Sequence, residues 1–228
     1  MTKTALITGI TGQDGYYLSQ LLLGKGYRVV GLLPPGRLGS AAKLDDLIDR
    51  VEIYPAALTN ADELIQAVYS LRPTEIYNLA APSFVPASWQ DPLGTLDLIT
   101  GTVTRLLKAT RQLGLNTRFY QASSSEIFGD VRSSPQTAET EFRPKNPYGA
   151  AKLHAHWTMV HHRQRYDLFA CSGILYNHES PRRPPRFVTR KISLTAAAIK
   201  LGMRDRLSMG SLDAKRDWGH ARDYVEGM

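Results

Sequence analysis

The stretch KTALITGITGQDG, from Lys3 to Gly15, indicates the fold of the chain. A short apolar run, typical of a buried strand, leads into a glycine-rich turn and then into a predicted helix that ends near residue 25. Glycines between a first strand and a first helix let the backbone approach a pyrophosphate at the helix N-terminus. An ordinary glycine turn is the alternative, but this position in the chain favours a dinucleotide site. Its candidate residues are Gly9, Thr11, Gly12, Gln13, Asp14 and Gly15.

The same alternation of apolar and helical patterns continues along the chain. Further strands are predicted at residues 28–33, 51–54, 75–79, 118–122 and 168–175, and helices at 44–49, 60–71, about 92–113 and 147–166. Thr59, with Asp62 three residues later, is expected to cap the helix at 60–71. Strands that alternate with helices form a parallel sheet covered on both faces. Residues 1–176 are therefore predicted to be a doubly wound, Rossmann-like α/β domain that binds the cofactor.

The pattern changes at Asn177, where loops rich in proline and arginine begin. They surround one predicted helix at 187–201, and residues 217–227 resemble the start of another. We expect residues 177–228 to be part of a substrate-binding region that is incomplete in this chain.

Composition places the chain among folded globular proteins. It has 228 residues, of which 43% are hydrophobic and 21% charged, and this excludes a low-complexity or disordered chain. The single cysteine, Cys171, lies in an apolar strand pattern and is expected to be an inert core thiol. The N-terminus does not resemble a signal peptide, and no apolar run is long enough for a membrane span. We therefore expect a cytoplasmic protein.

The formal net charge of +7 is concentrated near the C-terminus. Residues 1–180 carry 17 basic and 16 acidic side chains, whereas residues 181–228 carry 11 and 5. The basic residues alternate with proline and apolar residues, which is more typical of a folded anion site than of a nucleic-acid-binding arm. A solvated basic face is the alternative. No nucleic-acid-binding module is recognisable, so we expect no nucleic acid partner.

Two groups of residues carry candidate chemistry. Tyr148 and Lys152 are four residues apart at a helix start and hence share a face, where an ammonium would lower the pKa of a phenol. Such pairs also occur by chance, but this position in the sheet favours a catalytic role. Three serines and Glu126 follow the strand at 118–122, at the sheet edge where open α/β folds bind ligands. Glu126 is a candidate acid and base, although a serine cluster is more often a turn.

Cofactor choice depends on the residues after the second strand. NAD-selective sites place an acidic residue there, but this chain has Leu33, Pro34 and Pro35, followed by Arg37. The missing acid and the nearby guanidinium favour NADP, and a solvated Arg37 is the alternative.

Longer segments carry a resemblance to a known family. RFYQASSSEIFG, NPYGAAKLHAHW, ILYNHESPRR, FVTRKI and DAKRDWGHARDYV, with the glycine turn and the Tyr148/Lys152 pair, resemble the GDP-mannose 4,6-dehydratases, which are extended short-chain dehydrogenases/reductases. The resemblance covers nearly the whole chain.

The resemblance implies a redox-neutral dehydration of GDP-mannose with tightly held NADP. It implies that Tyr148, assisted by Lys152, takes the C4 hydroxyl proton and that Ser124, where the family usually has threonine, bonds the C4 oxygen. Glu126 would remove the C5 proton and assist loss of the C6 hydroxyl. Cofactor contacts would extend to Leu79, Ala80 and Ala81. Substrate contacts would come from Asn177, Glu179, Arg183, Lys191 and Arg216. A dimer or tetramer is implied, and no metal is expected.

Three departures from the family pattern keep alternatives open. Pro34-Pro35-Gly36 replaces an arginine-rich stretch, and Ala57 and Pro82 stand where the family has an aspartate and a polar residue. The rest of the family's C-terminal substrate domain is also expected to be missing. A nucleotide-sugar epimerase or reductase is one alternative, and Glu126 argues against it because those reactions remove no C5 proton. A noncatalytic nucleotide-sugar-binding homologue is the other.

Overall fold

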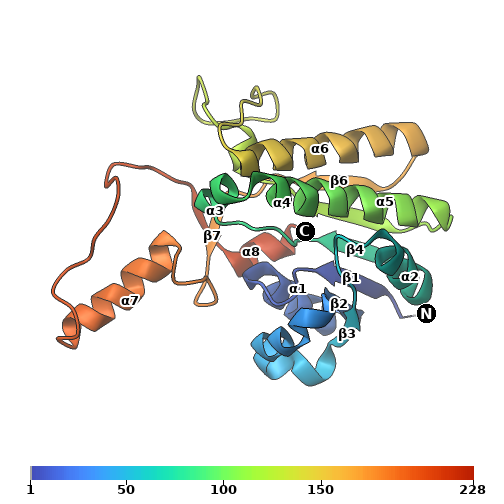
Figure 1. Cartoon of the computed structure of the whole chain (residues 1–228), viewed down its shortest axis with the longest axis horizontal. Helices are drawn as coiled ribbons and strands as arrows, with labels where there is room; N and C mark the ends of the chain where they lie inside the picture. The colour runs from blue at the N-terminus through green and yellow to red at the C-terminus, as the bar shows by residue number, and fades with distance from the viewer. Residues whose placement is uncertain (1) are drawn as a thin grey trace.

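The computed structural model describes residues 2–228 and contains one six-stranded parallel sheet, in the order β3-β2-β1-β4-β5-β6 (Figure 1). This order confirms the predicted Rossmann-like sheet. The strands are β1 (Thr4–Thr8), β2 (Arg28–Leu33), β3 (Glu52–Pro55), β4 (Glu75–Asn78), β5 (Arg118–Ala122) and β6 (Ala170–Gly173). The strand order reverses between β1 and β4, and such a switch point is where open α/β sheets bind ligands.

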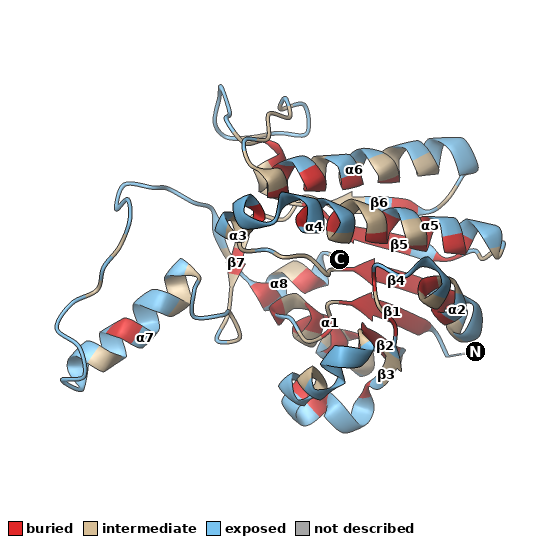
Figure 2. Cartoon of the chain, in the orientation of Figure 1, coloured by how far each residue is buried: buried red, intermediate tan, exposed pale blue. Residues whose placement is uncertain are grey.

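Helices cover both faces of this sheet. Helices α2 (Ala61–Leu71), α5 (Thr102–Gln112) and α6 (Pro147–Tyr166) lie on one face, and α1 (Gln13–Gly24) and α8 (Ala221–Glu226) lie on the other (Figure 1). Successive strand residues point to opposite faces, so Leu6 joins the first core while Ala5 and Ile7 join the second. The sheet is buried between two apolar layers, as Figure 2 shows.

The start of α2 differs from the prediction by one residue. The N-cap of α2 is Asn60, whose Oδ1 accepts from the backbone N–H groups of Asp62 and Glu63. The expected cap at Thr59 is wrong by one residue. The Glu63 carboxylate accepts from the Asn60 side chain and from the Ala57 backbone N–H, which fixes the turn before the helix.

The segment between β4 and β5 contains more, shorter helices than predicted. A short helix, α3 (Val85–Gln90), lies in a stretch without a predicted helix, and Pro86 occupies its first turn. The single predicted helix at 92–113 consists of α4 (Pro92–Leu96), a π-helical turn (Asp97–Gly101) and α5.

The C-terminal segment contains a second, two-stranded sheet. Strands β7 (Asn177–Glu179) and β8 (Trp218–His220) pair in parallel, and neither was predicted because each has only three residues. Helix α7 (Val188–Lys200) extends away from the sheet and is mostly exposed (Figures 1 and 2). Helix α8 returns the chain to the main body, where Ala221 and Val225 are buried beside α1.

Cys171 does not lie in the core, so that expectation is wrong. It lies on the edge strand β6 and is exposed. The neighbouring Phe169 is 57% exposed, because this edge of the sheet is covered on one face only. Separately, within residues 2–228 no helix is both long and apolar enough to cross a membrane.

Candidate active site

The glycine loop lies at the end of β1, in close backbone contact with the end of β4. Gly9 adopts a φ of +72°, and a Cβ there would lie 2.9 Å from the backbone nitrogen of Ala80. A Cβ on Gly15 would lie 2.5 Å from the carbonyl oxygen of Gly9. Only glycine permits these approaches. The Gly9 contact places the loop beside Leu79 and Ala80, two of the predicted cofactor residues.

The N-terminus of α1 fits a phosphate group. Its N-cap, Gly12, offers no side-chain acceptor to the N–H groups of the first turn. Unpaired N–H groups and the helix dipole at such a position favour a pyrophosphate. Arg37 follows the end of β2 in a run of 3₁₀ turns (Pro35–Arg50), with its backbone N–H donating to Pro34 and its side chain exposed.

Tyr148 and Lys152 lie together in the first two turns of α6, and both are buried. The Lys152 Nζ donates to the carbonyl oxygen of Ala122 at 2.7 Å and lies 5.6 Å from the centre of the Tyr148 ring. Burial raises the pKa of Tyr148 to about 12, and the neighbouring Ser124 hydroxyl only partly offsets it. Burial likewise lowers the pKa of Lys152 to about 8. The expected lowering of the Tyr148 pKa by Lys152 is therefore absent in this structure.

A buried chain of hydrogen bonds connects β1 to Lys152. Thr8 donates to Asn78 at 2.6 Å, and the Asn78 side-chain amide donates to Gln121 at 2.7 Å. The Gln121 amide donates in turn to the carbonyl oxygen of Ala122, which also accepts from Lys152. Sequence reasoning missed Asn78 and Gln121. The available signal was a polar residue near the carboxyl end of each of three neighbouring strands.

Glu126 lies in a short 3₁₀ turn, η3 (Ser125–Ile127), beside the start of α6. Ser124 caps this turn and accepts from the Glu126 backbone N–H. A Cβ on Gly149 would lie 2.5 Å from the carbonyl oxygen of Glu126, so the turn and the helix are in backbone contact. The Glu126 carboxylate accepts from the Asn146 side chain at 2.7 Å. Ser124, Glu126, Tyr148 and Lys152 are thus brought together, as the catalytic prediction requires.

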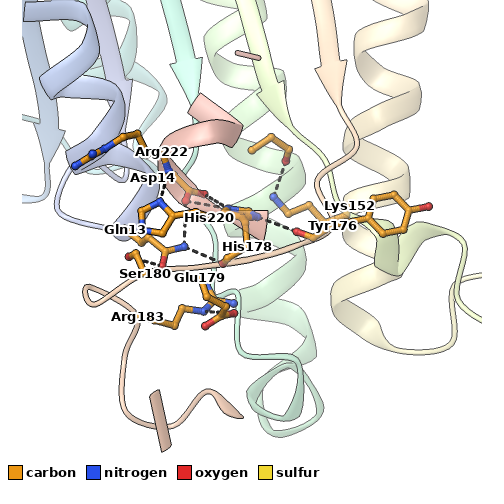
Figure 3. A network of polar contacts seen from close by, with 11 residues as sticks. Gln13, Asp14, Lys152, Tyr176, His178, Glu179, Ser180, Arg183, His220 and Arg222 are labelled. Carbon is orange, nitrogen blue, oxygen red and sulfur yellow. Dashed lines mark hydrogen bonds and ion pairs between the residues drawn. The ribbon is translucent and has the colours of Figure 1, made fainter. Parts of the chain in front are cut away.

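The glycine loop is also bonded to β7, in the network that Figure 3 draws. The His178 ring lies within 2.9 Å of both carboxylate oxygens of Asp14 and stacks on Tyr224. Gln13 donates to the carbonyl oxygen of His178 and accepts from Ser180. Two candidate cofactor residues, Gln13 and Asp14, therefore contact the segment that carries candidate substrate residues.

The candidate substrate residues fall into two groups. Asn177, Glu179 and Arg183 lie on or just after β7, and Arg183 pairs with Glu179 at 3.1 Å. Lys191 lies on α7 and Arg216 lies in the loop before β8, and both are exposed. The only described hydrogen bonds of their side chains go to backbone carbonyls, of Ser208 and Lys215 respectively. The structure thus brings together three of the five residues, and does not bond the other two to them.

Metal ligands show no clustering in this part of the chain. No group of three or more His, Cys, Asp or Glu side chains across residues 2–228 is arranged to hold an ion. Two histidines of α6 make aromatic contacts, since His156 contacts Phe142 and His161 stacks on Trp157.

Comparison with known proteins adds a family. The family model described as GDP-mannose 4,6 dehydratase matches residues 6–228. The chain is 47% identical to the GDP-mannose 4,6 dehydratase of Cricetulus griseus over 99% of this chain and 63% of that protein. It is also 47% identical to the GDP-mannose 4,6-dehydratase of Yersinia enterocolitica, over 98% of this chain and 62% of that protein. The chain thus spans less than two thirds of these relatives.

A solved structure agrees with the fold. The UDP-glucose 4-epimerase of Thermus thermophilus, solved as a complex with NAD, aligns with a TM-score of 0.81 at 25% identity. The alignment covers 98% of this chain and 72% of that chain.

Proposed function

The chain belongs to the GDP-mannose 4,6-dehydratase family, and from this we propose that it converts GDP-α-D-mannose to GDP-4-dehydro-6-deoxy-D-mannose and water. The observation that carries the proposal is the meeting of Glu126 with Tyr148 and Lys152 beside the glycine loop. A phenol–ammonium pair alone fits an epimerase or a reductase equally well. The additional carboxylate supplies the acid–base group that an elimination needs.

NADP is the cofactor we propose. When bound, it supplies the redox chemistry, accepting a hydride from the sugar at C4 and returning it at C6. Gly9, Gly12 and Gly15 would hold its pyrophosphate through close backbone approach, and Leu79, Ala80 and Ala81 would add further contacts from the end of β4. Arg37 would meet the 2′-phosphate, since a guanidinium suits that group and β2 ends without the acidic residue that would repel it.

The chain's own residues perform the proton transfers in this proposal. Tyr148 takes the proton of the C4 hydroxyl, Ser124 bonds the C4 oxygen, and Lys152 stabilises the phenolate once substrate is bound. The resulting C4 ketone acidifies C5. Glu126 then removes the C5 proton and protonates the departing C6 hydroxyl, which leaves as water. Return of the hydride to C6 would require a proton at C5, and the proton that Tyr148 took from the C4 hydroxyl completes the balance.

Nucleotide binding is assigned to the segment that follows β6. Asn177, Glu179 and Arg183 lie next to the glycine loop through the His178 contacts, and Lys191 and Arg216 would close on the GDP diphosphate from α7 and its following loop. Arg183, Lys191 and Arg216 also supply part of the basic excess of residues 181–228. We further propose a cytoplasmic dimer or tetramer that binds no nucleic acid.

The decisive experiment incubates the purified chain with NADP and GDP-mannose and measures the product by mass spectrometry. With the parent protein we expect a product 18 Da lighter than GDP-mannose, and with Glu126→Gln we expect no such product. NADP binding measured by calorimetry should be equal for the two proteins. Turnover by Glu126→Gln would contradict the acid–base assignment. Binding of both ligands without turnover in the parent would instead indicate a noncatalytic nucleotide-sugar-binding protein.

Cofactor choice needs a separate measurement that does not depend on turnover. We expect Arg37→Ala to weaken NADP binding about tenfold and to leave NAD binding unchanged. Arg50→Ala, at the other end of the same 3₁₀ run, is the matched control. Equal losses for NADP and NAD would show that Arg37 does not contact a 2′-phosphate.

A further inference from the structure

Asn146 connects the two halves of the candidate active site. Its Nδ2 donates to the Glu126 carboxylate at 2.7 Å, and its Oδ1 accepts from the backbone N–H of Gly149, also at 2.7 Å. The second bond caps α6, the helix that carries Tyr148 and Lys152. One amide group therefore contacts both the candidate elimination residue and the helix of the candidate proton-transfer pair.

The residue type suits this double contact. A side-chain amide has donors at one end and an acceptor at the other, whereas serine, aspartate and threonine, the other common N-caps, lack that separation. The backbone of Asn146 is extended, and Pro147 follows at the first helical position, where a missing N–H costs nothing. Both features direct the amide between the turn at Glu126 and the first turn of α6.

We propose that Asn146 is a positioning residue, which holds the Glu126 carboxylate in register with Tyr148 so that C4 oxidation and C5 deprotonation act on one bound sugar. The inference rests on the proposed function. Without Asn146, a Glu126 side chain has three rotatable bonds and no partner among the described contacts of its carboxylate. Loss of such orientation slows a proton transfer without weakening ligand binding.

Capping and positioning can be separated by substitution. Serine and aspartate cap a helix about as well as asparagine, whereas alanine does not. Serine is too short to bridge to Glu126, and aspartate places a second negative charge against it. A purely structural role predicts that activity follows stability, with Asn146→Ala the worst of the three variants. Positioning predicts instead that Asn146→Asp is as inactive as Asn146→Ala although it is more stable.

The experiment measures melting temperature, KM and kcat for the parent and the three variants. We expect Asn146→Ser and Asn146→Asp to melt within about 2 °C of the parent. We expect kcat to fall about 10- to 100-fold in Asn146→Ser and at least about 100-fold in Asn146→Asp, with KM for GDP-mannose changed less than about threefold. A parent-like kcat in Asn146→Ser or Asn146→Asp overturns the proposal. It is also overturned if the three variants have the same order in activity as in melting temperature.

A measurement independent of turnover distinguishes this inference from the proposed function. In ¹⁵N-labelled protein, the side-chain amide signal of Asn146 should move in Glu126→Gln and stay in place in Glu141→Gln, since Glu141 is exposed and outside the contact. An unmoved signal in Glu126→Gln refutes the contact whether or not the chain dehydrates GDP-mannose. If the parent is inactive but the Asn146 signal moves in Glu126→Gln, the proposed function is refuted and the contact between Asn146 and Glu126 is retained.

Discussion

His178 lies 2.8 Å from Asp14, with the imidazole Nε2 against the Oδ2 of a carboxylate 164 residues earlier in the chain. Asp14 is in the first turn of α1 and His178 is in β7, so this pair fastens the glycine loop to the C-terminal segment. Burial alone would lower the pKa of His178, but the hydrogen bond and the charge of Asp14 outweigh it and raise that pKa. Arg183 opposes the shift weakly.

This pair predicts a pH-dependent contribution to stability. Because the pKa of His178 is higher in the folded than in the unfolded chain, the stabilisation is complete below the ordinary value of 6.5 and is lost as pH rises through the folded value. We expect His178→Gln to cost about 1 to 2 kcal/mol of unfolding free energy near pH 6 and clearly less near pH 9. Urea denaturation of the parent and the variant near pH 6 and near pH 9 measures this cost. An equal cost at both pH values would contradict the predicted loss of the charged pair between them.

Lys152 is expected to lower the stability of the folded chain near neutral pH, although the proposed reaction needs it. Its pKa of about 8 lies below the ordinary 10.5 because the ammonium is buried. The cost of burying that charge is fully present below pH 8 and disappears as pH rises to 10.5. We therefore expect Lys152→Met to gain about 1 to 3 kcal/mol at pH 7, to lose that gain towards pH 10, and to lose all dehydration. A destabilised Lys152→Met at pH 7 would mean that its bond to Ala122 dominates.

Gly149 predicts a steric effect on the candidate active site. A Cβ there would lie 2.5 Å from the Glu126 carbonyl oxygen, so Gly149→Ala must separate the turn from α6. We expect a loss of about 1 to 3 kcal/mol in stability and at least about tenfold in turnover, with NADP affinity retained. Gly24→Ala is the matched control, because nothing lies within 4 Å and a helical alanine is favoured. Parent-like turnover by Gly149→Ala would show that the close contact is dispensable.

The repeated elements of the fold could be read from the sequence because their signals are local. The strands of the main sheet alternate with helical segments as far as β6, and Tyr148 and Lys152 share a face through helical spacing alone. Strands β7 and β8 could not be read this way, since three residues show no periodicity and their pairing joins Asn177 to Trp218. The same holds for His178 and Asp14, whose contact exists only after α8 packs on α1 and β7 packs on α8.

The chemistry of single groups was predicted less well than their positions. Spacing placed an ammonium beside the Tyr148 phenol, but burial of both groups controls their pKa values, and burial depends on the whole core. Cys171 was misjudged for a related reason, because an apolar strand pattern does not reveal that β6 is an edge. Asn146 was overlooked because its partner, Glu126, lies 20 residues away.

The buried chain from Thr8 through Asn78 to Gln121 predicts strong coupling between its members. Removing one amide leaves its buried partner without a hydrogen bond, so we expect Asn78→Leu and Gln121→Leu each to cost about 2 to 3 kcal/mol. The double variant leaves fewer unpaired groups and should cost about 1 to 2 kcal/mol less than the two single costs combined. Urea denaturation of the four proteins completes this cycle. Additive costs would show that the Asn78–Gln121 bond contributes nothing, and turnover should fall most in Gln121→Leu because Gln121 shares the Ala122 carbonyl with Lys152.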